Sequence, residues 1–168
     1  CALVTNIGTA HIENLHTREN IRAEKFHIMD GMKEGSVVFL NADNDLLFDP
    51  PKEKGIVYKY FSAKGNTSCD YYATDIVFNN AMPEFTAHIG GKKVRVHLNV
   101  FGEHQISNAL VAIAVADHYN LSVESAAKHL EEFRGFSHRQ ELIKLKDFTI
   151  IDDTYNASPD SMKASISI

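Results

Sequence analysis

The chain opens with a short apolar run, Ala2-Leu3-Val4, which passes into a polar loop and then into a helical pattern. The run is typical of a buried strand, and Asn6 and Gly8 end it. Thr17 is a suitable N-cap for a helix that we expect to continue to about Met32. Loops at the carboxyl ends of strands are where α/β proteins place their ligands. This strand–loop–helix unit therefore constrains the fold and marks its loop as a candidate site.

Two residues of this unit could carry chemistry. His11 lies in the loop, and Lys25 lies on the apolar face of the helix. At about 100° per residue, that face also contains Ile21, Ile28, Met29 and Met32. Taken alone, a loop histidine is more often a surface residue than a metal ligand, and a lysine beside apolar residues more often extends to solvent. Burial would lower the pKa of the lysine.

Composition narrows the class of protein. The chain has 168 residues, enough for a substantial core, and a net charge of −5 without a basic cluster, which disfavours binding to nucleic acid. Its two cysteines are far apart and form no metal-binding spacing, which predicts a cytoplasmic location. No apolar run approaches the roughly 20 residues of a membrane span. The sequence also lacks a Gly-Lys-Ser/Thr phosphate loop.

Further strands and helices follow from the spacing of apolar residues. Strands are expected at 36–40, 56–61, 71–78, 84–89, 93–98, 142–145 and 148–151, and helices at about 102–119, 122–133 and from 158 onward. A turn at 41–45 is expected to lead into a short helical piece. The strands between 71 and 98 form a meander, with Gly90-Gly91 as a hairpin signal.

Polar residues recur near the ends of these elements. Asn108 lies early in an apolar helix, where a satisfied buried amide and a binding residue are equally open interpretations. Arg139 follows the glycine at position 135 and precedes a strand, so it is either a solvated charge or part of a domain junction. Asp152 and Asp153 end the last strand, which favours a site there.

The chain resembles the Mur ligases, the ATP-dependent amide-forming enzymes of peptidoglycan synthesis. The segments that carry the resemblance are TNIGTAHIENL…TRENIRAEK at 5–25, FGEHQISNAL at 101–110, SHRQE at 137–141 and DDTYNASPDSM at 152–162. The last segment is most similar to the branch of the family that adds D-alanyl-D-alanine. The chain departs from the family's usual residues at His16, His27, Gln105 and Ser158.

The resemblance implies an α/β fold with a mostly parallel sheet, flanking helices and an antiparallel β meander. It also implies two domain parts: 1–136 as the later part of an ATP-binding central domain, and 137–168 as the start of a C-terminal Rossmann-like domain. Because the chain begins with Cys1 inside a strand pattern and ends in a helical pattern, we expect it to be a fragment. Because it lacks a phosphate loop and its C-terminal domain is cut after one helix, we expect no ATPase or ligase activity from it alone.

The same resemblance implies the site residues. His11 and Lys25 would be catalytic and would hold Mg²⁺, with Lys25 modified by carbon dioxide to a carbamate. ATP would be bound by Asn108 at the adenine, Arg139 at the phosphates, Asp153 on the ribose side, and by Tyr155 and Asn156.

The implied reaction is the ATP-dependent addition of D-alanyl-D-alanine to a UDP-N-acetylmuramoyl tripeptide through an acyl phosphate. The expected protein is a monomer without nucleic-acid or membrane partners. Two alternatives stay open. One is another Mur-type amino-acid ligase, such as a folylpolyglutamate or cyanophycin synthetase relative, against which Tyr155-Asn156-Ala157 argues. The other is a non-catalytic binding module with the same fold.

Overall fold

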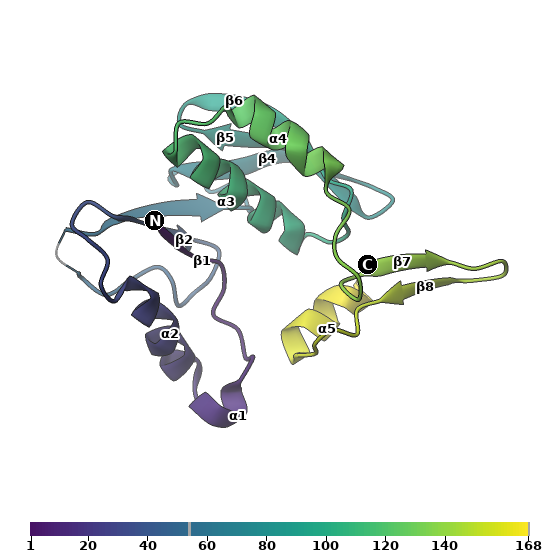
Figure 1. The fold of residues 1–168 in the computed structure, drawn as a ribbon, viewed down its shortest axis with the longest axis horizontal. Helices are drawn as coiled ribbons and strands as arrows, with labels where there is room; N and C mark the ends of the chain where they lie inside the picture. The colour runs from purple at the N-terminus through teal and green to yellow at the C-terminus, as the bar shows by residue number, and fades with distance from the viewer. Residues whose placement is uncertain (54, 168) are drawn as a thin grey trace.

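The computed structural model describes residues 1–53 and 55–167. Within them, six strands form the main sheet, in the spatial order β1 to β6 (Figure 1). These strands are β1 (Ala2–Val4), β2 (Val37–Asn41), β3 (Val57–Ser62), β4 (Tyr71–Asn79), β5 (Met82–Ile89) and β6 (Lys92–His97). The helical elements are α1 (Ile12–Leu15), α2 (Arg18–Phe26), the 3-10 turn η1 (His27–Met29), α3 (His104–His118), α4 (Val123–Glu132) and α5 (Pro159–Ile166).

The sheet changes direction at β4. Strands β1 to β4 pair in parallel, and β4, β5 and β6 pair antiparallel as a meander. Gly90 and Gly91 make the tight connection between β5 and β6, where both have positive φ. The expectation of a mostly parallel α/β sheet with an antiparallel meander is confirmed.

Strand β2 is buried on both faces, as is usual for parallel strands covered on two sides. Val37 and Phe39 pack with β3, the meander, α3 and α4 in one core cluster. Val38 and Leu40 pack on the other face, where α2 contributes Ile21 and Phe26, in a second cluster.

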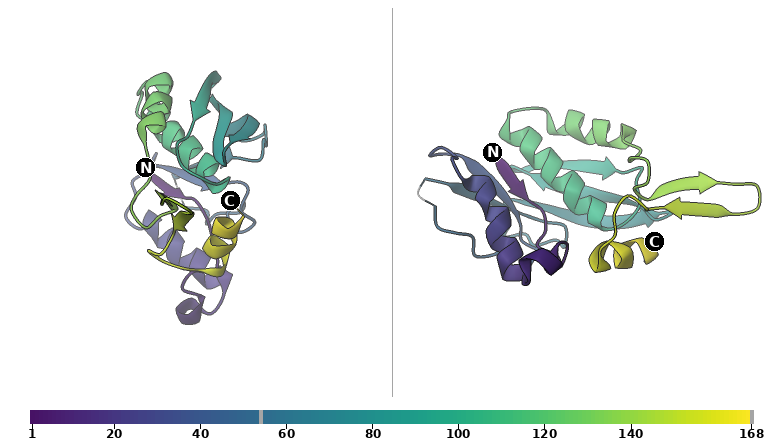
Figure 2. Two further views of the ribbon diagram at one scale, coloured as in Figure 1. Left: turned by 90° about the vertical axis from the view of Figure 1, so that its right-hand side faces the viewer. Right: turned by 60° about the horizontal axis from the view of Figure 1, so that its bottom comes forward.

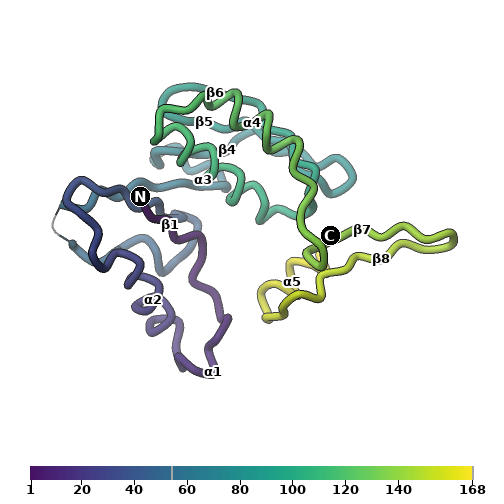
Figure 3. The backbone as a smooth tube through the Cα atoms, in the orientation of Figure 1, coloured from purple at the N-terminus to yellow at the C-terminus, as the bar shows by residue number. Residues whose placement is uncertain are grey.

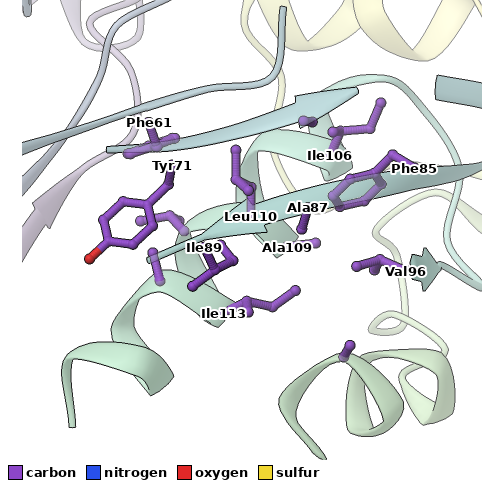
Figure 4. Packing of buried hydrophobic residues seen from close by; sticks show 14 of the residues in the cluster. Phe61, Tyr71, Phe85, Ala87, Ile89, Val96, Ile106, Ala109, Leu110 and Ile113 are labelled. Carbon is purple, nitrogen blue, oxygen red and sulfur yellow. The ribbon is translucent and has the colours of Figure 1, made fainter. Parts of the chain in front are cut away.

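Helix α3 lies across the larger cluster and is apolar over most of its surface. Ile106, Leu110 and Ile113 are fully buried and face the sheet side chains Phe85 and Ile89 (Figure 4). This agrees with the sequence pattern, which predicts a helix packed on more than one side. Ser122 begins α4 as predicted, because its hydroxyl accepts a hydrogen bond from the amide of Ser125 at 3.1 Å.

Three local expectations are wrong. The first helix ends at Phe26 instead of near Met32, because the chain tightens into η1, and this leaves Ile28 51% exposed. The loop after β1 contains α1, which the sequence pattern did not indicate. The segment after 41–45 forms turns and not a helical piece; Arg22 binds its carbonyls, with Nε donating to Leu46 at 2.8 Å.

The C-terminal segment turns away from the main sheet. After α4 the chain forms a hairpin of β7 (Glu141–Lys144) and β8 (Thr149–Asp152), which projects outward before α5 returns (Figure 2). The tube in Figure 3 shows α5 folded back toward the connection between β1 and α1. Within residues 1–53 and 55–167, no helix is long and apolar enough to cross a membrane.

Replacing Leu110 tests the role of α3 in the core. Leu110→Ala should lower the free energy of unfolding by about 2–5 kcal/mol, because the side chain is fully buried and its removal leaves a cavity. The matched control is Leu121→Ala, which truncates a leucine that is 62% exposed and should change stability by less than about 0.5 kcal/mol. Urea unfolding followed by circular dichroism measures both. Equal effects of the two substitutions would contradict this packing.

Candidate active-site cleft

The candidate site is a cleft between the carboxyl ends of β1, β2 and β3 and the C-terminal segment. Its volume is about 1300 Å³. One wall comes from the loops after these three strands and from the first turns of α3, and the other comes from residues 133–167. Because parallel strands end at one edge of the sheet, their loops gather polar groups from distant parts of the chain.

The loop after β1 is held by side chains that bind three successive backbone carbonyls, those of residues 5–7. Asn41 Nδ2 donates to the first carbonyl at 2.9 Å, and Lys25 Nζ donates to the second at 2.7 Å. Arg18 Nη2 donates to the third at 2.8 Å. The three donors come from the end of β2 and from the two ends of α2, so the loop is fixed against both elements.

Arg18 also ties this loop to the one after β2. Its guanidinium pairs with Asp45 through two hydrogen bonds, Nη1–Oδ2 at 2.9 Å and Nη2–Oδ1 at 2.6 Å. The hydrogen bond from Arg18 lowers the pKa of Asp45. Asn44 adds a bond from Nδ2 to Asn6 Oδ1 at 2.7 Å. A bidentate fork of this kind fixes direction as well as distance.

Lys25 lines the cleft at the end of α2. Solvent reaches much of its side chain, but burial around the amine lowers the pKa of Lys25 below its usual range. This is the direction that the sequence predicts, although the apolar stripe invoked for it is interrupted where α2 gives way to η1. A lowered pKa increases the fraction of neutral amine, which is the form that reacts with carbon dioxide.

His11 is the residue immediately before α1, and it has a left-handed backbone with φ of 65°. Its side chain is exposed, and it is not among the residues that line the cleft, whereas the preceding residues 8–10 are. The structure thus brings the backbone before His11 to the cleft beside Lys25, with the imidazole just outside the lining. The role of His11 stays a prediction.

A buried hydroxyl fixes the loop after β3. Ser62 is fully buried, and its Oγ donates to Asp43 Oδ1 at 2.6 Å. The same carboxylate accepts from the amide of Ala63 at 2.7 Å. Ser62 Oγ in turn accepts from the amide of Lys64 at 3.1 Å. This satisfied network holds a further cation, Lys64, in the cleft lining.

Three of the residues predicted to bind ATP line the cleft together: Asn108, Arg139 and Asp153. Asn108 is exposed toward the cleft and is not a buried amide; its Nδ2 donates to Gln105 Oε1 at 3.1 Å. Arg139 stacks on Tyr155, with Cζ 4.0 Å from the ring centroid. This stacking restrains the guanidinium fork that could bind phosphate.

The other two predicted residues, Tyr155 and Asn156, are exposed and do not line the cleft. Tyr155 contributes the ring under Arg139, and its amide donates to the carbonyl of His138 at 3.2 Å. Asn156 Oδ1 accepts from the following amide, that of Ala157, at 2.9 Å. In this structure both residues shape the loop before α5.

His138, Glu141 and Asp152 meet at the base of the β7–β8 hairpin, with ligand atoms within 4.8 Å of one another. His138 Nδ1 lies 2.8 Å from Asp152 Oδ2, and Glu141 Oε2 accepts from the hydroxyl of Ser137 at 2.8 Å. Hydrogen bonds from the Thr154 hydroxyl and then from His138 lower the pKa of Asp152. These hydrogen bonds give the three residues a structural role, which is to orient the β7–β8 hairpin. They leave Asp153 to face the cleft.

His104 also lines the cleft, although no sequence motif marked it as a functional candidate. It is the first residue of α3. Partial burial in the cleft lowers the pKa of its imidazole, although the residue is exposed to solvent. The nearby charge of Asp153 acts in the opposite direction. Gly102 is the one sequence feature that points to this position. It has a φ of 97°, and a Cβ there would lie 2.7 Å from His104 Cε1.

A second, smaller cavity of about 450 Å³ lies near the end of α2 and is lined by Arg22, His27 and Asp30 among others. It contains none of the predicted site residues. His27 Nδ1 and Asp30 Oδ2 are 2.9 Å apart there, an exposed local pair. The large cleft is therefore the better candidate for chemistry.

A parallel sheet with convergent polar loops at its carboxyl edge defines an α/β protein of the ligand-binding kind. The model of the Mur ligase middle domain matches residues 1–116. The chain therefore belongs to the Mur ligase family, which confirms the resemblance seen in its motifs.

The chain is also similar to named members of this family. It is 34% identical over 168 residues to a UDP-N-acetylmuramoyl-tripeptide–D-alanyl-D-alanine ligase of Bacillus subtilis, covering 99% of this chain and 35% of that protein. It superposes on a crystal structure of MurF from Acinetobacter baumannii with a TM-score of 0.87 and 31% identity, covering 96% of this chain and 35% of that one. MurF from Thermotoga maritima in complex with ADP gives a TM-score of 0.80 at 25% identity, covering 98% of this chain and 37% of that one. The chain spans about a third of the length of these relatives.

The environment of His104 gives a pH-dependent prediction. NMR titration of the imidazole should give a pKa below the reference value of about 6.5. Asp153→Asn should lower it further, because the carboxylate charge raises it. Since the folded pKa lies below the unfolded one, stability should fall as the pH falls between about 6.5 and the folded value. A pKa unchanged by Asp153→Asn would show that the two groups do not face each other.

Proposed function

We propose that this chain supplies the ATP-handling cleft of a ligase that adds D-alanyl-D-alanine to a UDP-N-acetylmuramoyl tripeptide. The main support is the similarity over nearly the whole chain to a ligase of that name from Bacillus subtilis and to MurF from Acinetobacter baumannii. The cleft adds chemical support, because it gathers Lys25, Asn108, Arg139 and Asp153 from distant segments.

In the proposed reaction, the carboxylate of the tripeptide attacks the terminal phosphorus of ATP and releases ADP. The amine of D-alanyl-D-alanine then attacks the carbonyl carbon of the acyl phosphate, the amide bond forms, and inorganic phosphate leaves. Both steps develop negative charge on phosphoryl oxygens. Cationic groups fixed before the reaction stabilise that charge without further reorganisation.

The residues on the nucleotide side suit the parts of ATP in different ways. Arg139 offers a guanidinium fork, held by Tyr155, that matches two phosphate oxygens. Asn108 can donate and accept at an adenine edge, and it is an exposed residue near the start of α3 that lines the cleft. Asp153 offers a carboxylate to the ribose side, and Asn156 supports its loop.

Lys25 near the end of α2, once it is a carbamate, and His11 before α1 would hold the magnesium ion. A carbamate supplies oxygen ligands, which magnesium prefers, whereas His11 would add one imidazole nitrogen. When bound, the ion supplies positive charge to the phosphoryl oxygens. The Lys25 amine is held in the cleft wall by its hydrogen bond to the carbonyl of Asn6, at 2.7 Å, and burial lowers its pKa.

We further propose that residues 1–136 belong to the central domain and that residues 137–168 begin the C-terminal one. The turn of direction after α4 supports this boundary. A monomer in the cytoplasm, where ATP is available, is the proposed setting. Other Mur-type ligases and a non-catalytic module remain the competing hypotheses, and Tyr155-Asn156-Ala157 favours the D-alanyl-D-alanine branch.

Lys25→Ala tests the proposal in an intact ligase that contains this chain. Turnover, measured as ADP release, should fall by at least about 100-fold, because an anionic metal ligand is lost. The matched control is Lys33→Ala, which removes an exposed lysine outside the cleft and should leave turnover unchanged. A short carboxylic acid in the buffer should restore part of the activity by replacing the carbamate. Normal turnover of Lys25→Ala, or full activity after removal of bicarbonate, would contradict the carbamate role.

A further inference from the structure

Helix α5 is attached to the loop before α1 by one carboxylate. Asp160 Oδ2 accepts hydrogen bonds from both the amide and the hydroxyl of Thr9, each at 3.1 Å. The two residues are 151 positions apart in the sequence. They belong to opposite walls of the cleft, so this contact, which we call the Thr9–Asp160 clasp, joins the walls directly.

The close approach depends on Gly8. A Cβ at this position would lie 2.8 Å from Asp160 Oδ2 and 2.9 Å from Asn6 Nδ2. Gly8 is not among the glycines with positive φ, so its backbone conformation is open to other residues. A side chain at this position would therefore force the Asp160 carboxylate or the Asn6 amide to shift.

The clasp connects the two groups of proposed site residues. On one side, the carbonyl of Thr9 accepts from the amide of Ile12 at 3.2 Å, which begins α1 directly after His11. On the other side, Asp160 lies in the first turn of α5 and follows the loop that starts with Asp153. The clasp therefore sets the position of the loop that starts with Asp153 relative to the loop that precedes His11.

We propose that Asp160 is a positioning residue that keeps the C-terminal segment closed over the cleft through the Thr9–Asp160 clasp. This inference rests on the proposed ATP-dependent reaction. Asp160 binds Thr9 and does not contact the substrate, so its effect on the reaction comes only from closing the cleft. If the clasp is lost, the closed form is less populated, and the apparent affinity for a ligand of that form falls by the same fraction.

Three variants separate the clasp from other effects. Asp160→Ala removes the acceptor. Asp160→Asn keeps an acceptor oxygen but loses the charge that favours the start of α5. Asp147→Ala is the matched control, because it removes an exposed acid outside the cleft in the same C-terminal segment.

Hydrogen exchange of the Thr9 amide in the 168-residue chain measures the clasp itself. Asp160→Ala should speed this exchange about tenfold, since it removes the hydrogen bond that the Thr9 amide donates. Asp160→Asn should keep most of the protection, and Asp147→Ala should keep all of it. Unchanged exchange in Asp160→Ala would overturn the clasp.

Kinetics in an intact ligase containing this chain measure the positioning role. Asp160→Ala should raise KM for ATP about three- to tenfold with kcat nearly unchanged, because saturating ATP restores the closed form. A merely structural role would lower kcat through loss of folded enzyme and leave KM unchanged. Loss of Thr9 protection without a rise in KM would overturn the positioning role.

Gly8→Ala breaks the same contact from the other side and gives an independent check. If both substitutions act through the clasp, the increase in KM for Gly8→Ala combined with Asp160→Ala should be clearly smaller than the product of the single increases. A multiplicative result would overturn the shared mechanism. A wild-type ligase without ADP release on the tripeptide would instead contradict the proposed function, and Thr9 exchange would still decide the clasp.

Discussion

The geometry of the cleft depends on the binding of three successive carbonyls, those of residues 5–7, by side chains from other elements. Asn41, Lys25 and Arg18 each satisfy one of them. Backbone carbonyls at a strand end need partners, and here each partner is a residue whose own position is fixed by β2 or α2. The loop can shift only if several of these bonds break together. Its rigidity places the amine of Lys25 and the start of α1 at the same edge of the sheet.

The change of strand direction at β4 explains why the cleft has two kinds of wall. The parallel strands end at one edge and supply polar loops, while the antiparallel meander forms the base on which α3 packs. The first turns of α3 then face the same edge with Asn108 and His104. The C-terminal segment completes the cleft with Arg139 and Asp153, so that groups of opposite charge from distant parts of the chain line one space.

The sequence predicted most elements because their periodicity is strong: β1 to β8, α3, α4 and α5 all lie close to the expected residues. It failed where long-range side chains decide the backbone. In the turns at 42–49, the carbonyl of Leu46 accepts a hydrogen bond from Arg22 Nε, a contact across 24 positions that no local pattern encodes. The chemistry of Lys25, Asn108, Arg139 and Asp153 could be proposed from motifs, but their convergence could not. The contacts of Thr9 with Asp160 and of His104 with the C-terminal segment depend on how distant segments dock.

We propose that this cleft serves an amide ligase specific for a dipeptide. The most direct measurement is ADP release by an intact ligase containing this chain, supplied with a panel of UDP-muramoyl peptides and amine acceptors. We expect rapid release only when a UDP-N-acetylmuramoyl tripeptide and D-alanyl-D-alanine are both present, with one amide formed per ADP. Equal or faster release with a single amino acid as acceptor, or no release with any pair, would contradict it.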